Sequence, residues 1–228
     1  MDPSTILKYV VRVIIIFLIL PIHEYAHAWA AKKLGDDTAL YSGRLTLNPL
    51  AHIDPIGAIC LFITGFGWAK PVPVNPMRFK KSRKGMALTA LAGPASNLIV
   101  AFIAIIIYRF ILYTDMYNDA FVSSIISGDN TILFFNMFPI FISINVGLAV
   151  FNLLPIPPLD GSKILSYFTS AKVDKFLYQY QQYIPIIFVL IIGLGALDVP
   201  LTWASGKIIT GMWFLTSWVD LIMEAVNK

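Results

Sequence analysis

Two long stretches without a charged residue constrain this chain more than any other feature. Residues 86–108 and 132–159 contain no Asp, Glu, Lys or Arg. A helix needs about 20 consecutive apolar residues to cross the hydrocarbon core of a bilayer, and both stretches are long enough. Only 13% of the 228 residues are charged, whereas soluble domains carry about 25%. The sequence therefore predicts a polytopic integral membrane protein.

Two further apolar segments, at about residues 6–34 and 176–197, are also predicted to cross the membrane. A last segment, 199–219, is interrupted by Lys207, and both a crossing and an interfacial helix remain open for it. We expect an all-α bundle of about five to six transmembrane helices. It forms one domain over residues 1–228, with its core at about 6–165 and its C-terminal helices at about 176–225.

The region between the first two spans is predicted to be a small, membrane-associated extended or β insertion. Residues 43–49 have the pattern of a short strand closed by a turn, and residues 68–74, broken by two prolines, are predicted to be extended. Residues 53–66 are apolar but too short to cross, which favours a re-entrant or interfacial piece. An unwound substrate could pair with such extended backbone by strand addition. An ordinary surface hairpin is the alternative, and the pattern supports it equally.

The basic residues are interpreted as topology signals. The net charge is +4, and the densest basic cluster follows residue 77 and precedes the 86–108 span. Basic residues at the ends of apolar runs mark the cytoplasmic side of a membrane, so we expect no nucleic-acid partner. The cluster consists of Arg78, Lys80, Lys81, Arg83 and Lys84.

The first predicted span contains the sequence His23-Glu24-x-x-His27. Residues four apart share one face of a helix, so the two imidazoles can bind one metal ion from the same side. Glu24 can then reach a water molecule at that metal. At 1.5 Å per residue, His27 lies roughly 8 Å and His23 roughly 14 Å from Lys32, at one side of the bilayer. The alternative is a pair of buried structural histidines, but three ionisable groups within one turn at membrane depth favour a functional site.

A catalytic zinc site has three protein ligands and one open position. Asp160 is the best third candidate, because it follows the apolar 132–159 span within a proline-rich turn on the same expected side of the membrane. Its alternative is a solvent-facing aspartate at a helix end. Cys60 is the single cysteine, which excludes an internal disulfide and a cysteine-based zinc site.

Four further polar residues have open roles. Asn152 could stabilise an oxyanion or hold substrate backbone, and helix packing is nearly as well supported. Asn97 faces either a neighbouring helix, which the pattern favours, or the active-site cavity. His52 and Asp54 follow the first extended segment, and a structural or interfacial role is favoured over orientation of a ligand for His52.

Three motifs in this order resemble the site-2 protease family. They are His23-Glu24-x-x-His27, Ala92-Gly93-Pro94-x-x-Asn97 and Asn152-x-x-Pro155-x-x-x-x-Asp160-Gly161. The stretch from Gly43-Arg44 to His52-x-Asp54-Pro55 is also similar to the membrane-embedded extended region of that family. The resemblance covers about residues 20–165. Relative to larger relatives, the chain is expected to lack a preceding span, a PDZ insertion and a nucleotide-sensing C-terminal domain.

The resemblance implies a zinc-dependent intramembrane endopeptidase that cuts transmembrane segments of other membrane proteins. It implies one zinc ion held by His23, His27 and Asp160, base chemistry at Glu24 and an accessory role for Asn152. The expected partners are a transmembrane protein or peptide substrate and the lipid bilayer. The expected location is a prokaryotic cell membrane, with the active site nearer the cytoplasmic side. The alternative is a non-catalytic zinc-binding adaptor or a zinc transporter.

Overall fold

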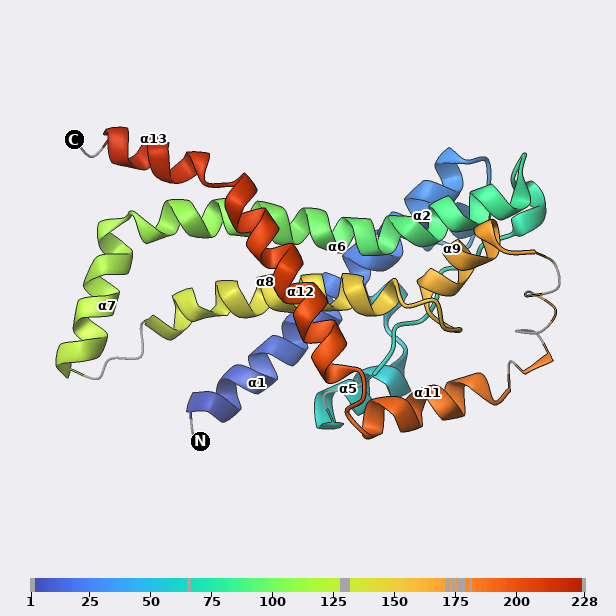
Figure 1. Cartoon of the computed structure of the whole chain (residues 1–228), viewed down its shortest axis with the longest axis horizontal. Helices are drawn as coiled ribbons and strands as arrows, with labels where there is room; N and C mark the ends of the chain where they lie inside the picture. Colours follow the sequence, from blue (N-terminus) through green and yellow to red (C-terminus); the bar gives the residue numbers. More distant parts are fainter. Residues whose placement is uncertain are drawn as a thin grey trace. The chain divides into compact units, whose positions relative to one another are not determined.

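The computed structural model describes residues 3–64, 67–127, 132–170, 173, 175, 179–180 and 182–226, and these are mainly helical (Figure 1). Within them no sheet forms, and one isolated antiparallel bridge joins Ile53 to Ala69. The first half of the chain contains α1 Pro3–Ile14, the π-helix η1 Ile15–Ile19, α2 Leu20–Lys33, α3 Thr38–Tyr41, α4 Pro49–His52, α5 Pro55–Thr64, the 3-10 helix η2 Pro76–Arg78 and α6 Ser82–Leu112. The second half contains α7 Asp115–Ser127, α8 Ile132–Asn152, α9 Asp160–Phe168, α11 Ile184–Gly193, α12 Asp198–Leu215 and α13 Trp218–Val226.

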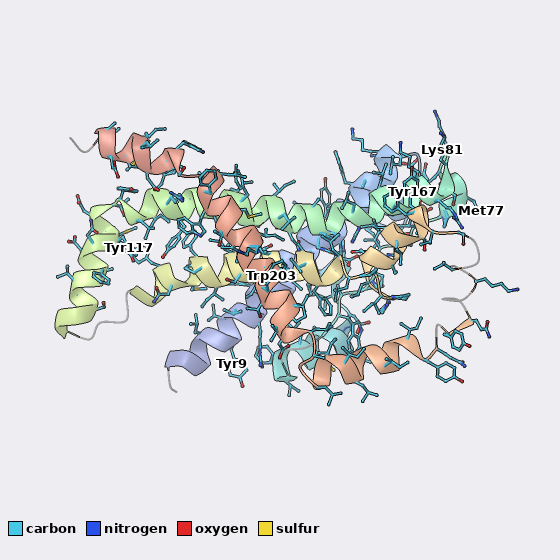
Figure 2. The ribbon with its side chains drawn as sticks, viewed as in Figure 1. Tyr9, Met77, Lys81, Tyr117, Tyr167 and Trp203 are labelled. Atoms are coloured by element: carbon cyan, nitrogen blue, oxygen red, sulfur yellow. The ribbon has the colours of Figure 1, made fainter. Side chains whose placement is uncertain are left out.

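Three helical segments in the described part of the chain are long and apolar enough to cross a membrane: Tyr9–Lys33, Ser82–Leu112 and Phe135–Asn152. The number is up to four if α12 and α13, bent by 41° at their junction, act as one span. Large apolar side chains are exposed, as lipid contact requires, and Trp203, labelled in Figure 2, is 67% exposed. The chain is an all-α polytopic membrane protein, as predicted. The count of five to six spans stays a prediction, since the expected 176–197 span lies partly outside the described residues.

The chain divides into two compact units. One comprises Met1–Asn97 with Leu148–Val199, and the other comprises Leu98–Gly147 with Pro200–Lys228. The first unit contains every candidate site residue. In the second unit the buried Arg109 pairs with Asp220, and its guanidinium lies 4.4 Å from the centre of the Trp213 ring. The single domain over residues 1–228 stays a prediction.

The first span changes its helical winding just before the two histidines. The five residues of η1 form a π-helical turn, and Pro21, which has no N–H to donate, follows at the start of α2. At the other end of α2, Gly35 takes a φ of 103°, and the N–H of Asp36 bonds to the carbonyl of Ala31 at 2.9 Å. This Schellman closure ends the helix just after Lys32 and Lys33.

The predicted strand at residues 43–49 is wrong, because these residues form a turn, a bend and irregular backbone before α4 begins at Pro49. The carbonyl of Thr46, which a strand would offer to a neighbouring strand, instead lies 2.7 Å from Nε2 of His52. Asn48 then caps α4 by accepting a hydrogen bond from Leu50 N–H at 3.1 Å. Residues 68–74 do run extended, and their one β-bridge in the described part of the insertion joins Ala69 to Ile53.

Candidate metal centre

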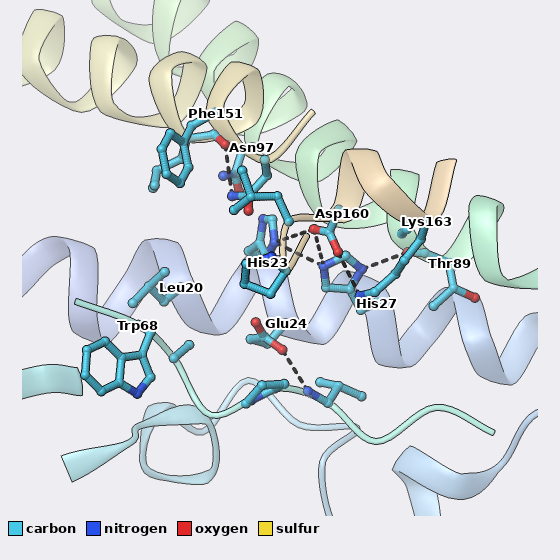
Figure 3. Close-up of a pocket in the computed structure, with 18 of the residues that line it drawn as sticks. Leu20, His23, Glu24, His27, Trp68, Thr89, Asn97, Phe151, Asp160 and Lys163 are labelled. Carbon is cyan, nitrogen blue, oxygen red and sulfur yellow. Dashed lines mark hydrogen bonds and ion pairs between the residues drawn. The ribbon is translucent and has the colours of Figure 1, made fainter. Parts of the chain in front are cut away.

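The structure places the side chains of His23, His27 and Asp160 together, although Asp160 is far from the histidines in sequence (Figure 3). The two Nε2 atoms are 3.0 Å apart. Oδ2 of Asp160 lies 3.3 Å from Nε2 of His23 and 3.1 Å from Nε2 of His27. All three side chains are buried. The histidines come from one turn of α2 and the carboxylate from the first residue of α9.

This triangle of atoms fits one zinc ion. Zn–N and Zn–O bonds of about 2.0–2.1 Å at tetrahedral angles put neighbouring ligand atoms about 3.3 Å apart. Nδ1 of His27 lies 2.7 Å from the carbonyl of Thr89. Because that carbonyl can only accept, His27 carries its proton on Nδ1 and presents the lone pair of Nε2 to the centre. A cation bound between this lone pair and the carboxylate would stabilise their close contact.

The second oxygen of Asp160 also has a partner. Nζ of Lys163, one turn further along α9, lies 3.2 Å from Oδ1, while Oδ2 faces the histidines. Burial raises the pKa of the Asp160 carboxyl, but its contacts with His23, His27 and Lys163 outweigh burial and hold the pKa below its ordinary value. The Asp160 side chain is therefore an ionised group with one oxygen directed at the candidate metal position.

The three side chains line a cavity of about 630 Å³, which Glu24 also lines. Binding pockets usually enclose about 300–1,000 Å³. One wall is the extended segment, residues 68–74, whose Val72 N–H donates a 3.0 Å hydrogen bond to Oε2 of Glu24. Figure 3 shows the Glu24 carboxylate on the side of the cavity next to this segment. Glu24 therefore lies at the cavity beside the candidate metal position.

Two buried charged residues anchor the extended segment. Arg44 donates hydrogen bonds to the carbonyl of Lys70 at 2.5 Å and to that of Pro71 at 3.1 Å. Burial lowers the pKa of the Arg44 guanidinium, while the nearby Glu24 carboxylate opposes this change. At the other end, Oδ2 of Asp36 accepts the N–H of Asn75 at 2.6 Å. The backbone that reaches Glu24 is thus held on both sides of Val72.

The remaining sequence candidates take different positions. Asn152 lines the cavity, and its Nδ2 donates to the carbonyl of Leu148 at 3.0 Å, which leaves a second hydrogen on that nitrogen. Asn97 also lines the cavity. His52 is buried beside Arg44, with its Nδ1 3.4 Å from the guanidinium, and Asp54 caps α5 by accepting Gly57 N–H at 2.8 Å. Both contacts agree with structural roles for these two residues.

Gly93 brings α6 against the candidate centre. A Cβ at this position would lie 2.4 Å from Nε2 of His27 and 2.6 Å from Cε1 of His23, too close for any other residue. The close approach of α6 at Gly93 is therefore to the imidazoles themselves.

Several contacts at the site are not apparent from the sequence motifs. The contact of Lys163 with Asp160 could be predicted from the sequence, because a basic residue three positions after an acidic residue on a helix can reach the acidic side chain. No local pattern predicts the contacts of Arg44, Asp36 and the Thr89 carbonyl, because the bonded partners are 26 or more residues apart in sequence.

Comparison with known proteins identifies the family of this chain. The family model described as peptidase family M50 matches residues 11–195. A Bacillus subtilis (strain 168) protein, YwhC, described as a candidate zinc metalloprotease, is 40% identical over 189 residues, which cover 83% of this chain and 82% of YwhC. No solved structure matches the chain.

More distant relatives carry the same description. Rip2 of Mycolicibacterium smegmatis (strain ATCC 700084 / mc(2)155) is 28% identical over 184 residues, which cover 78% of this chain and 65% of Rip2. MJ0611 of Methanocaldococcus jannaschii is 27% identical over 166 residues, which cover 72% of this chain and 73% of MJ0611. The chain belongs to peptidase family M50, the site-2 protease family that its motifs resemble.

Proposed function

We propose that this chain is a zinc-dependent intramembrane endopeptidase that cuts peptide bonds in or near transmembrane segments of other membrane proteins. The observation that carries the proposal is the buried group of His23, His27 and Asp160 in a cavity that Glu24 also lines. Relatives described as candidate zinc metalloproteases support zinc as the metal.

The proposed division of labour follows from the position of each group. His23, His27 and Asp160 hold the zinc, which when bound supplies Lewis-acid activation of water and of the substrate carbonyl. Glu24 takes a proton from the attacking water as its oxygen bonds to the carbonyl carbon. The same carboxyl then gives that proton to the amine nitrogen as the C–N bond breaks, so one water molecule is consumed per cut.

Asn152 is proposed to assist this reaction from the cavity wall. One hydrogen of its Nδ2 is bonded to the Leu148 carbonyl, which fixes the direction of the amide. The second hydrogen is available to the oxygen of the carbonyl under attack, where negative charge develops.

The protein is proposed to act in a prokaryotic cell membrane with this site nearer the cytoplasmic side. Exposed basic residues between η2 and α6, such as Lys81 (Figure 2), support that orientation, because basic residues flanking a span stay on the cytoplasmic side. The three relatives described above come from bacteria and an archaeon.

The test uses purified protein in liposomes with a reporter transmembrane peptide. Glu24→Gln should retain zinc, since Glu24 is outside the metal-binding group, and should lower cleavage by about 10²–10⁴. The glutamine carbonyl can still accept the Val72 N–H, so the cavity wall is preserved. Unaltered cleavage in Glu24→Gln removes Glu24 from the mechanism, and a zinc-loaded wild type that cuts nothing favours an adaptor or transporter.

A further inference from the structure

The amide of Asn97 is buried and has no hydrogen-bond partner within the described part of the chain. The residue is 1% exposed, and neither Oδ1 nor Nδ2 has a partner among the residues that the structure describes. A buried amide without partners costs free energy, and buried polar groups in native proteins are nearly always paired. Asn97 therefore needs a partner other than the residues that the structure describes.

A second buried asparagine shows the ordinary arrangement. Asn145 is also 1% exposed, and its Nδ2 donates to the carbonyl of Phe141 at 2.9 Å. Asn152 uses the same bond to the residue four positions earlier in its helix. Asn97 does not make this bond, although it too lies within a long helix. Burial in a helix therefore does not explain its unpaired state.

The position of Asn97 indicates what kind of partner its amide can bind. It follows Gly93 by four residues in α6, and residues four apart share one face of a helix. Gly93 contacts the imidazoles of His23 and His27, so this face of α6 is directed at the candidate metal centre. Asn97 lines the same cavity, and Figure 3 shows it near His23 and Asp160.

We propose that Asn97 binds the backbone of the substrate segment, with Nδ2 donating to a substrate carbonyl and Oδ1 accepting a substrate N–H. This inference rests on the proposed protease function. An amide presents one donor group and one acceptor, the complement of an unwound peptide unit. In an apolar transmembrane segment the peptide groups are the main polar partners on offer, and they are exposed only after unwinding. Asn97 thus favours unwound over helical segments.

The first test replaces Asn97 with an apolar side chain of similar size. Asn97→Leu removes the unpaired groups, so its thermal midpoint should equal or exceed that of the wild type, with full zinc content. Its kcat/KM for a reporter transmembrane peptide should fall about tenfold, the loss of one or two hydrogen bonds. In a Glu24→Gln background, which cannot cut, the same change should weaken binding of the peptide by a similar factor.

Asn145→Leu is the matched control, because it removes an amide of equal burial that has its own partner. It should lower the thermal midpoint and leave kcat/KM close to the wild-type value. The inference is overturned if Asn97→Leu loses thermal stability while its kcat/KM is unchanged, which would show that Asn97 binds a structural water molecule. Absence of cleavage by the wild type would instead refute the protease function itself.

A second pair of variants keeps the inference testable if Asn97→Leu does not fold. Asn97→Ser and Asn97→Ala are close in size and differ in a hydroxyl that can donate and accept. The serine variant should cut the reporter severalfold faster than the alanine variant at equal zinc content. Equal rates would show that no polar contact is made from this position.

Discussion

The backbone N–H of Val72 donates a 3.0 Å hydrogen bond to the Glu24 carboxylate. The bond joins the extended segment at residues 68–74 to the proposed catalytic base, and both line the same cavity. Proline residues 71 and 73 flank Val72 and have no N–H, so Val72 is the donor that this part of the segment offers. The position of Glu24 therefore depends on how firmly the segment is held.

Arg44 is expected to control this position without touching the substrate. Arg44→Met removes the donors for the Lys70 and Pro71 carbonyls, and each buried acceptor left unpaired costs about 1–3 kcal/mol. We expect kcat to fall about tenfold, with zinc content retained, because a displaced segment no longer holds Glu24. Steady-state kinetics and limited proteolysis at the segment measure this. Lys81→Met, on an exposed side chain, is the control, and wild-type kcat in Arg44→Met would refute the anchoring role.

Gly93→Ala is expected to weaken metal binding while the helices still form. Its Cβ would lie 2.4 Å from His27 Nε2, so one imidazole must move. Metal affinity should fall at least about 10–100-fold, the cost of disturbing a ligand's surroundings. Zinc per chain, measured by elemental analysis after dialysis, checks the result. Gly147→Ala, with nothing within 4 Å of the added carbon, should retain its zinc. Full zinc occupancy in Gly93→Ala would show that the site tolerates a shifted α6.

Asp36 is expected to make the stability of the folded protein depend on pH in the acidic range. Burial raises the pKa of this carboxyl, but hydrogen bonds from Thr38 and Asn75 and the charge of Arg78 outweigh burial, so the pKa lies below its ordinary 3.8. Because the folded state lowers this pKa, the ionised carboxylate stabilises the fold. This contribution is complete at neutral pH and is lost as the pH falls below about 3.8.

Asp36→Asn should therefore lower the thermal midpoint at pH 7, by the equivalent of about 1–3 kcal/mol for an unpaired buried donor. The difference from the wild type should shrink as the pH falls below 3.8. Thermal unfolding in detergent at several pH values measures both the deficit at pH 7 and its change with pH. Asp37→Asn, whose side chain makes no capping bond, should match the wild type throughout. An Asp36→Asn deficit that is the same at every pH would contradict the charge argument.

Substrates with helix-breaking residues near the cut site should be cut faster. A helical segment hides its peptide groups in bonds from each residue to the fourth preceding one, so it must unwind before it can be attacked. Gly or Pro substitutions costing the helix about 1–3 kcal/mol should raise kcat/KM several-fold. The same substitutions far from the cut site serve as controls. Equal rates for rigidly helical substrates would remove the unwinding step from the account.

The sequence predicts the grouping of His23, His27 and Asp160 better than it predicts the surrounding contacts. Helical periodicity predicts that His23 and His27 share a face, and charge bias predicts that Asp160 arrives at the same depth, because both depend on local pattern and membrane topology. The strand predicted at residues 43–49 fails because the His52 side chain takes the Thr46 carbonyl, a contact that β propensity does not register. The contacts that anchor the extended segment cannot be predicted from the sequence for a related reason. Arg44 is buried and binds main-chain carbonyls, which any residue can supply.

The most direct test of the whole account is the zinc X-ray absorption spectrum of the purified protein, measured for the wild type and for Asp160→Asn. The wild type is predicted to show two imidazoles and a carboxylate around one zinc ion. Asp160→Asn should lose more affinity than the about 10–100-fold that removal of an outer partner costs, and any residual spectrum should lack the carboxylate. An Asp160→Asn protein with full zinc and an unchanged spectrum would contradict the metal centre described here.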